Sequence, residues 1–297
     1  MGIKLPAYKA KNALPAYLMQ SNILLINCPD QKGLVFKVTD ILYNKFGLNI
    51  ISNAEFVERK HQHFFMRTEF SGTFQRDELL SDLEKVLPQN VHIKLTDQRK
   101  KDIVVMATKE YHCLSDLLIR HTFNDLNANI LCVISNYNDL EPLTHKFNVP
   151  FYHISHEGKS REAHEAVVME VIQQYDPAFV VLAKYMRILS VDFVSRFENK
   201  LVNIHHSFLP AFVGANPYAQ AYERGVKIIG ATAHFVNNEL DQGPIIAQSV
   251  IPVDHSYSAR EMARSGRDVE KNVLAKALKL VLHEQVFVYR NKTIIFE

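Results

Sequence analysis

Residues 201–243 gather side chains that can polarise a carbonyl group and move protons. At the ends of two predicted strands in this stretch lie one amide, three imidazoles and one carboxylate, namely Asn203, His205, His206, His234 and Asp241. An imidazole acts as a general acid or base near neutral pH, and an amide N–H can stabilise an oxyanion. We therefore treat this stretch as a candidate reaction centre.

The spacing of these residues suggests a catalytic role for each side chain. Asn203 and His205 are two residues apart at the end of an apolar run, so on an extended chain both point to one side. Asp241 can orient an attacking water or keep an imidazole protonated, and His234 can hold Asp241. No serine or cysteine stands as an obvious nucleophile, which favours direct attack by water or an amine on an acyl carbon. A histidine at a strand end also occurs in a purely structural role.

The elements that must position these residues form an alternating pattern in the second half of the chain. Short, uniformly apolar runs predict strands at residues 103–107, 130–134, 151–154, 179–183 and 201–204, with helices between them. Such strands indicate a parallel sheet that is covered on both faces. Sites form at the carboxyl ends of these strands, where Asn203 and His205 fall.

The chain after this point carries Asp241 on a loop. Residues 226–236 and 245–252 are predicted strands, and the loop 237–244 joins them. Ser258 and Glu261 have the spacing of a capping box, which predicts a long helix over 258–282. A last strand is expected at 292–296.

The turn after the first of these strands contains no glycine. It reads Thr-Lys-Glu-Tyr-His over residues 108–112. Such a turn cannot wrap a phosphate or pyrophosphate in the usual backbone cradle. A nucleotide cofactor is therefore disfavoured, and we expect no permanently bound cofactor.

The first part of the chain predicts a smaller α+β domain. Strands are expected at residues 22–27, 48–57, 63–70 and 91–95, with helices at 34–46 and 74–87. The order strand–helix–strand–strand–helix–strand is that of the ferredoxin-like fold. A polar run separates it from the second domain, so the expected organisation is an arm at 1–20, domains at 21–96 and 102–297, and a linker at 97–101.

Composition excludes several classes of function. The net charge of +2 gives no basic excess for binding nucleic acid, and the apolar runs are too short to span a membrane. Three scattered cysteines favour a reducing, cytoplasmic setting over a disulfide framework. His61 and His63 lack a third ligand nearby, so no metal site is expected. The arm has lysines and no acid, so an organellar transit peptide is the alternative to a partly ordered arm.

A resemblance in the first domain concerns the run Cys-Pro-Asp-Gln-Lys-Gly-Leu-Val at residues 28–35. It resembles the start of an ACT domain, a small regulatory module that often binds amino acids at a subunit interface. The resemblance implies a homo-oligomer, and an effector site at Asp30, Gln31, Lys32 and Gly33. A helix N-terminus offers unpaired N–H groups that suit a carboxylate. The alternative is that this turn only shapes the chain, because many such modules bind nothing and simply dimerise.

A second resemblance covers residues 102–297. Asn203-Ile204-His205 followed by Ser207 and Leu209-Pro210, with Asp241 seven residues after His234, is similar to the signature of the folate-dependent formyltransferases. The family has a Rossmann-like α/β domain with a mostly parallel sheet. The resemblance implies a catalytic trio of Asn203, His205 and Asp241 with His234 in support. It implies substrate binding by Met186, Arg187, Ile188, Leu189 and Gly243.

The pairing of the two domains is similar to the deformylases of this family, which hydrolyse 10-formyltetrahydrofolate to formate and tetrahydrofolate. Folate is then the substrate, the formate serves purine synthesis, and the reaction balances the one-carbon pool. The implied mechanism has Asp241 orienting water while Asn203 and protonated His205 stabilise the oxyanion. His205 then passes a proton to N10 of the folate.

Two positions depart from the deformylase pattern. Asn216 stands where a basic residue is usual, and Ala219 where a histidine is usual. The lost positive charge is expected to weaken contact with the anionic glutamate tail of folate. Two alternatives stay open beside the hydrolase. One is a formyltransferase that uses an amine acceptor such as glycinamide ribonucleotide. The other is a protein that binds folate and an amino acid but has a decayed catalytic site.

Overall fold

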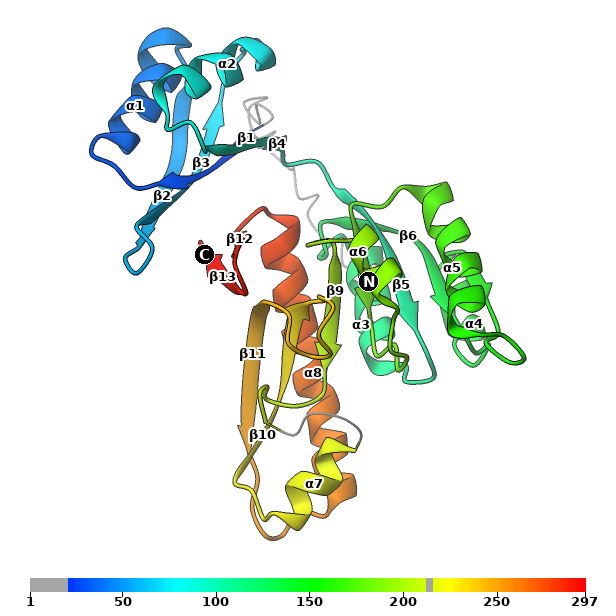
Figure 1. The fold of residues 1–297 in the computed structure, drawn as a ribbon. Coiled ribbons are helices and arrows are strands. Elements are labelled where there is room, and N and C mark those ends of the chain that lie inside the picture. Colours follow the sequence, from blue (N-terminus) through cyan, green and yellow to red (C-terminus); the bar gives the residue numbers. More distant parts are fainter. Residues whose placement is uncertain (1–20, 212–215) are drawn as a thin grey trace, which may run out of the picture. The chain divides into compact units, whose positions relative to one another are not determined.

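The computed structural model describes residues 21–211 and 216–297, which separate into two compact units between Gln98 and Arg99 (Figure 1). The predicted arm, and the alternative that it is a transit peptide, lie outside the described residues. Each unit has its own sheet and its own core, and the functional argument concerns mainly the second.

The first unit is a four-stranded antiparallel sheet in the order β2-β3-β1-β4, with helices packed on it. Its elements are β1 (Asn22–Pro29), α1 (Leu34–Asp40), η1 (Ile41–Lys45), β2 (Asn49–Glu58), β3 (His63–Ser71), α2 (Arg76–Val86) and β4 (His92–Asp97). The predicted order of strands and helices is confirmed. The helix expected at 34–46 ends in a π-helical turn, η1, in which the adjacent Ile41 and Leu42 are both buried.

The connection between the units is shorter than the sequence predicts. Strand β4 continues to Asp97, which pairs with Asn22, and the next strand already begins at Lys101, which pairs with Ala128. Only residues 98–100 lie between the two strands. Polar side chains do not prevent strand formation here, because the ladder is made by backbone groups.

The second unit is a seven-stranded sheet with helices on both faces. Its elements are β5 (Lys101–Ala107), α3 (His112–Thr122), β6 (Ala128–Ser135), α4 (Glu141–His145), β7 (Phe151–His153), α5 (Arg161–Tyr175), β8 (Phe179–Leu182), α6 (Val191–Arg196), β9 (Leu201–His205), α7 (Pro217–Glu223), β10 (Ile228–Phe235), β11 (Ile245–Pro252), α8 (Ala259–Leu282), β12 (Val286–Tyr289) and β13 (Lys292–Ile295).

The strand order in that sheet is β11-β10-β9-β8-β5-β6-β7. Strands β5 to β9 pair in parallel, whereas β10 and β11 are antiparallel to their neighbours. The predicted mostly parallel sheet is therefore confirmed. The order reverses between β8 and β5, and ligands of such sheets bind outside the carboxyl ends of the strands near this reversal.

Consecutive residues of the central strands enter different cores. Val105 and Val181 belong to the core that α3 and α8 cover (Figure 1). Val104 and Val180 belong to the opposite core, which α5 and α6 cover. Burying one such side chain stabilises the fold by roughly 1.5–3 kcal/mol, which explains why these strands are continuously apolar over residues 103–107 and 179–182.

Helix α8 begins as its sequence predicts. The Ser258 hydroxyl accepts a hydrogen bond from the Glu261 N–H, and the Glu261 carboxylate accepts one from the Ser258 N–H, so the capping box is confirmed. Helix α7 and strand β12 were not predicted, because they are short and lie in segments interrupted by glycine, proline or charged residues. Among the described residues, no helix is both long and apolar enough to cross a membrane.

Candidate active site

A cavity of about 300 Å³ opens at the carboxyl ends of β8 and β9. Its walls come from the loop after β8, from β9 and β10, and from the loop between β10 and β11. Eight of the residues predicted from the sequence line it, namely Met186, Arg187, Ile188, Leu189, Asn203, His205, His234 and Asp241. The polar residues of the stretch 201–243 and the predicted folate-binding segment therefore share one cavity.

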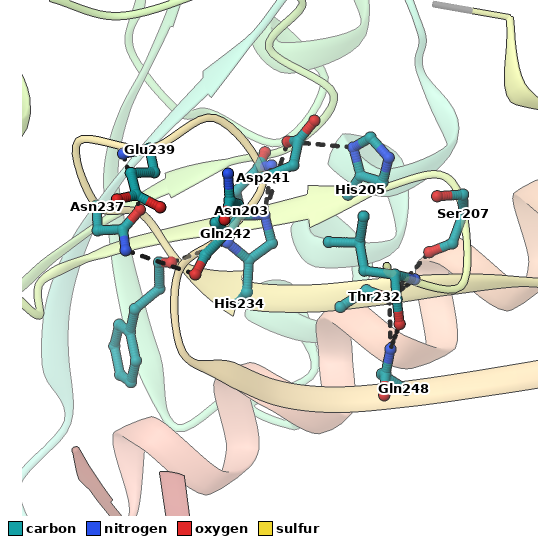
Figure 2. A network of polar contacts seen from close by, with 12 residues as sticks. Asn203, His205, Ser207, Thr232, His234, Asn237, Glu239, Asp241, Gln242 and Gln248 are labelled. Carbon is teal, nitrogen blue, oxygen red and sulfur yellow. Dashed lines mark hydrogen bonds and ion pairs between the residues drawn. The ribbon is translucent and has the colours of Figure 1, made fainter. Parts of the chain in front are cut away.

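The pairing of β9 with β10 sets the positions of three polar side chains. Asn203 lies directly opposite His234, and His205 lies opposite Thr232. Directly opposed side chains of an antiparallel pair are near neighbours. The Asn203 Nδ2 atom is 3.2 Å from Nε2 of His234 (Figure 2).

The hydrogen bonds of His234 define its tautomer. Its Nδ1–H donates to the carbonyl oxygen of Phe235 at 2.8 Å. Burial lowers the pKa of His234, although the bond to Phe235 and the charge of Asp241 oppose that effect. The neutral ring then has a lone pair on Nε2, which accepts a hydrogen bond from Asn203. This bond fixes the amide so that its second N–H is available to the cavity.

The structure gives His234 a different role from the predicted one. Its Nε2 atom is 4.0 Å from Asp241 Oδ1 and carries no proton in this tautomer. It therefore orients Asn203 and does not hold Asp241. The sequence could not distinguish these roles, because both depend on which ring nitrogen carries the proton.

Asp241 is paired with His205. Its Oδ1 atom lies 3.3 Å from Nδ1 of His205 (Figure 2). Burial alone would raise the pKa of Asp241, but the hydrogen bond and charge of His205 hold it below its ordinary value. Asp241 is thus a carboxylate that accepts the Nδ1–H of His205.

The other ring nitrogen of His205 has no internal partner. Its Nε2 atom is buried and forms no hydrogen bond within the described parts of the chain. His205 lines the cavity, and its Nδ1 is already used by Asp241. A buried polar atom without a partner is rare in proteins and indicates a missing ligand or water. We infer that Nε2 is the atom that exchanges a proton with the substrate.

The loop that carries Asp241 is held by a hydrogen bond from the terminal hairpin. Asp241 has a left-handed backbone conformation, with φ of 57°. Beside it, the amide of Asn291 donates to the carbonyl oxygen of Gln242 at 2.8 Å. Asn291 lies between β12 and β13, so this terminal hairpin helps to fix the position of the Asp241 carboxylate.

Gly243 lies outside the cavity lining, although the resemblance implied that it binds substrate. It is buried, and a Cβ atom at this position would come within 1.7 Å of the carbonyl oxygen of Phe235. Only glycine permits this approach of two backbone segments. The residue therefore serves to bring the loop with Asp241 back onto β10.

Gly243→Ala is expected to lower kcat by at least about 10-fold, because the added methyl group must displace the loop that carries Asp241. Steady-state kinetics on the purified variant measures the effect. Gly158→Ala is the control, since a Cβ at Gly158 meets no atom within 4 Å, and its positive φ of 69° makes the added side chain a backbone strain that Gly243 does not have. Equal activity of the two variants would contradict this role of Gly243.

The end of β9 is held by a hydroxyl group on the neighbouring strand. Thr232 Oγ1 donates to the carbonyl oxygen of Ser207 at 2.9 Å and accepts the N–H of Leu209 at 3.0 Å (Figure 2). Gln248 on β11 donates to Thr232 Oγ1 at 2.9 Å. These bonds fix the chain directly after His205 and so limit the movement of its ring.

The folate-binding segment predicted from the sequence forms an apolar wall. Met186 and Ile188 line the cavity and are 57% and 60% exposed. The segment is anchored at its start, where Thr108 Oγ1 donates to the carbonyl oxygen of Lys184 at 2.7 Å. It is anchored at its end by Glu165, which accepts the N–H of Ser190 at 2.9 Å. A fixed apolar wall beside a few polar groups is typical of sites for flat organic ligands.

The cavity lining also contains His206, which the sequence placed in the candidate reaction centre without a role of its own, and Lys184 and Glu239, which were not predicted to belong to the site. Burial and the nearby Lys184 ammonium lower the pKa of His206 to about 4, so its ring is neutral. For Lys184 the sequence did contain a signal, namely a lysine inside an otherwise apolar run at a strand end.

The two departures from the deformylase pattern lie on α7. Asn216 and Ala219 are exposed and neither lines the cavity. Asn216 is the N-cap of α7, with a left-handed φ of 54°. Their effect on the folate tail stays a prediction.

The predicted effector residues lie at the turn before α1. Residues 30–33 are exposed. Gly33 is the N-cap and has φ of 86°, a conformation that favours glycine. The backbone conformation alone is a sufficient reason for glycine at position 33, whether or not a ligand binds there. Effector binding stays a prediction.

Comparison with known proteins identifies the second unit as a formyl transferase domain, because residues 101–278 match the family model described as formyl transferase. A formyltetrahydrofolate deformylase from Haemophilus influenzae is 53% identical over 278 residues, which cover 94% of this chain and 100% of that protein. The chain therefore belongs to the formyltetrahydrofolate deformylase family.

Solved structures agree with this assignment. A formyltetrahydrofolate deformylase from Pseudomonas syringae has a TM-score of 0.91 at 40% identity, and the match covers 96% of this chain and 97% of that one. A glycinamide ribonucleotide transformylase from Symbiobacterium toebii has a TM-score of 0.64 at 29% identity and covers only 67% of this chain. The predicted formyltransferase fold and the predicted resemblance to deformylases are both confirmed.

Proposed function

We propose that this protein hydrolyses 10-formyltetrahydrofolate to formate and tetrahydrofolate. The observation that carries the proposal is the unpartnered Nε2 atom of His205, which lies in the cavity while Nδ1 is bound to the Asp241 carboxylate. The relatives that match the chain over both units are named as formyltetrahydrofolate deformylases.

The cavity suggests how the substrate lies. The flat ring system of the folate packs against the wall of Met186, Ile188 and Leu189, and the formyl group points towards the catalytic trio. The free N–H of Asn203 and the Nε2–H of protonated His205 then donate to the formyl oxygen. Donors of this kind stabilise the negative charge that develops on that oxygen in the transition state.

Water is the attacking group in this mechanism. The Oδ2 atom of Asp241 forms no hydrogen bond with the described residues, so it can accept one from a water molecule. The water oxygen bonds to the formyl carbon, and its proton passes to Asp241. His205 gives its Nε2 proton to N10, and the C–N bond breaks to leave formate and tetrahydrofolate. The proton on Asp241 returns to His205, and the second proton of the water leaves with formic acid, which ionises to formate in solution, so the protons balance.

The alternative is a formyltransferase with an amine acceptor. The transformylase neighbour covers 67% of this chain, whereas the deformylase neighbour covers 96%. The additional first unit is thus shared with the deformylases. This difference favours water as the acceptor.

Formate release from 10-formyltetrahydrofolate, with and without glycinamide ribonucleotide, tests the proposed function. We expect the same rate of formate release in both reactions and no formylated ribonucleotide. Formylated ribonucleotide that forms when glycinamide ribonucleotide is present would show that the protein is a formyltransferase. Tight folate binding without turnover would indicate the decayed catalytic site.

We also propose that the first unit is an ACT domain, that the protein is a homo-oligomer, and that an amino acid bound at residues 30–33 regulates the activity. The order β2-β3-β1-β4 of its antiparallel sheet supports the ferredoxin-like assignment. Deformylase assays against a panel of amino acids identify an effector, and light scattering measures the oligomer.

The wider role follows from the reaction. The released formate would supply purine synthesis, and the reaction would balance the one-carbon folate pool. We propose that no permanently bound cofactor is needed, because the side chains of the trio provide each proton transfer and folate is the substrate. We place the protein in the cytoplasm, since all three cysteines are buried, unpaired thiols.

A further inference from the structure

A buried carboxylate on α8 connects four elements of the second unit. Glu270 is 1% exposed. It accepts hydrogen bonds from His112 Nε2 on α3 at 2.7 Å and from the Tyr218 hydroxyl on α7 at 2.6 Å. The Lys184 ammonium lies 3.2 Å from its Oε2 atom. A buried charge is costly unless several such partners surround it.

These partners keep the carboxylate ionised. Burial alone would raise the pKa of Glu270, but the bond from His112, the Lys184 ammonium and the Tyr218 hydroxyl hold it at about 2. Glu270 therefore carries a full negative charge at any pH at which the protein works.

The neighbouring turn of α8 is shaped to admit Tyr218. Gly266 lies one helical turn before Glu270 and is buried. A Cβ atom at this position would lie 1.9 Å from the Tyr218 hydroxyl oxygen. The glycine leaves the space in which that hydroxyl reaches Glu270, so the network is built into the sequence of the helix.

The same residues could be considered as a metal site. Ligand atoms of His112, Cys113 and Glu270 lie within 4.8 Å of one another. However, the Lys184 ammonium already lies beside Oε2 of Glu270, the oxygen that also accepts His112. Burial also raises the pKa of the Cys113 thiol, so the thiol is neutral beside the ion pair. The cluster is an internal ion pair.

This ion pair borders the catalytic cavity. Lys184 is itself 6% exposed and lines the cavity together with His205 and His206. The His206 ring lies between the two sites, with its centroid 5.2 Å from that of His205 and 6.1 Å from that of Tyr218. The charges of Lys184 and Glu270 both act on His206, in opposite directions.

Charged or titratable groups face this region from every element packed around it. Around His205 at the end of β9 and the adjacent His206 they are His234 on β10, Asp241 after β10, Lys184 after β8 and Glu270 on α8. Around Glu270 they are His112 and Cys113 on α3, Glu110 before α3, Tyr218 on α7, and Arg267 on α8 itself. Lys184 is the cation that lines both the cavity and this cluster.

We propose that Glu270 is a positioning residue whose negative charge balances Lys184 and so lets His205 keep its proton at the pH of the hydrolysis. This inference rests on the proposed function. Glu270 acts through Lys184 and makes no contact with the catalytic trio in the described structure. Without the carboxylate, the uncompensated ammonium would oppose a second positive charge on the nearby imidazole.

The pH dependence of kcat tests this role with four variants of the full chain. Glu270→Gln is expected to move the alkaline limb of the profile to lower pH by on the order of one unit, as the loss of one nearby charge does. Lys184→Met leaves Glu270 uncompensated and is expected to move the limb to higher pH. The double variant Glu270→Gln/Lys184→Met removes both charges and is expected to return the limb towards its wild-type position.

Glu284→Gln is the matched control, because Glu284 is also buried and paired with a lysine, Lys101, at 3.4 Å, and neither lines the cavity. The alkaline limb of the pH profile of Glu284→Gln is expected to lie at the same pH as in the wild-type enzyme. A Glu270→Gln enzyme with lower kcat but the wild-type limb would show a merely structural role and overturn the proposal. If Glu270→Gln does not fold, the Lys184→Met enzyme tests the proposal alone. An alkaline limb of its pH profile at the wild-type pH or at a lower pH would overturn the proposal.

A second measurement separates this proposal from the proposed function. Carbon-13 histidine NMR on the free protein, assigned with His205→Ala, follows the titration of His205 without any turnover. We expect its midpoint to fall in Glu270→Gln and to rise in Lys184→Met. An unchanged midpoint overturns the positioning role, whereas a protein that releases no formate but shows these shifts overturns only the proposed function.

Discussion

Asp241→Asn is expected to lower kcat by at least about 100-fold while the protein stays folded. The asparagine has nearly the same shape, but it removes the negative charge that pairs with the His205 ring across the 3.3 Å contact. It also removes the oxygen that accepts the proton of the attacking water. Single-turnover and steady-state rates of formate release measure this effect.

The matched control for Asp241→Asn is Asp254→Asn. Asp254 is an exposed aspartate that only caps a turn by accepting hydrogen bonds from Ser256. We expect wild-type activity for this control. Wild-type turnover in Asp241→Asn would remove Asp241 from the mechanism.

The pKa of Asp241 adds a pH criterion. Because it lies below its ordinary value, Asp241 stays ionised as the pH falls past the usual aspartate range. Activity that depends on this carboxylate is therefore retained above the lowered pKa and is lost as the pH falls through it. Glu270 titrates near its pKa of about 2 and cannot cause a loss of activity well above that pH.

His205→Ala is expected to cost at least about 100-fold in kcat, because it removes the general acid that protonates N10. The loss is expected in kcat more than in KM, since the apolar wall that holds the folate is unchanged. Formate release at saturating substrate measures it, and folate binding by fluorescence shows whether the cavity is intact.

His145→Ala controls for the loss of an imidazole, because the His145 side chain is 60% exposed and remote from the cavity lining. This control is expected to have wild-type kcat. A His205→Ala enzyme with a normal kcat would show that another group protonates the leaving nitrogen.

The sequence predicted the elements and the trio because both follow from local rules. Asn203 and His205 share a side of β9 because side chains alternate along a strand. Asp241 could be placed in a loop between two strands because the strands on either side are apolar. The capping box of Ser258 and Glu261 is likewise a local pattern, and it was read correctly.

The remaining features depend on contacts between distant parts of the chain. The role of His234 depends on the tautomer that the Phe235 carbonyl selects and on the register with β9. Glycine is required at position 243 because the chain there closely approaches the backbone of β10. Glu270 lies 158 residues from His112 in sequence, and nothing near either residue predicts their hydrogen bond.

The oxygen that the formate acquires tests the central claim most directly. The account predicts that hydrolysis of 10-formyltetrahydrofolate in water enriched in oxygen-18 gives formate with one labelled oxygen per molecule, at the same rate as tetrahydrofolate appears. Mass spectrometry of the formate measures the label. Formate without the label, or loss of the formyl group only in the presence of an amine that becomes formylated, would contradict it.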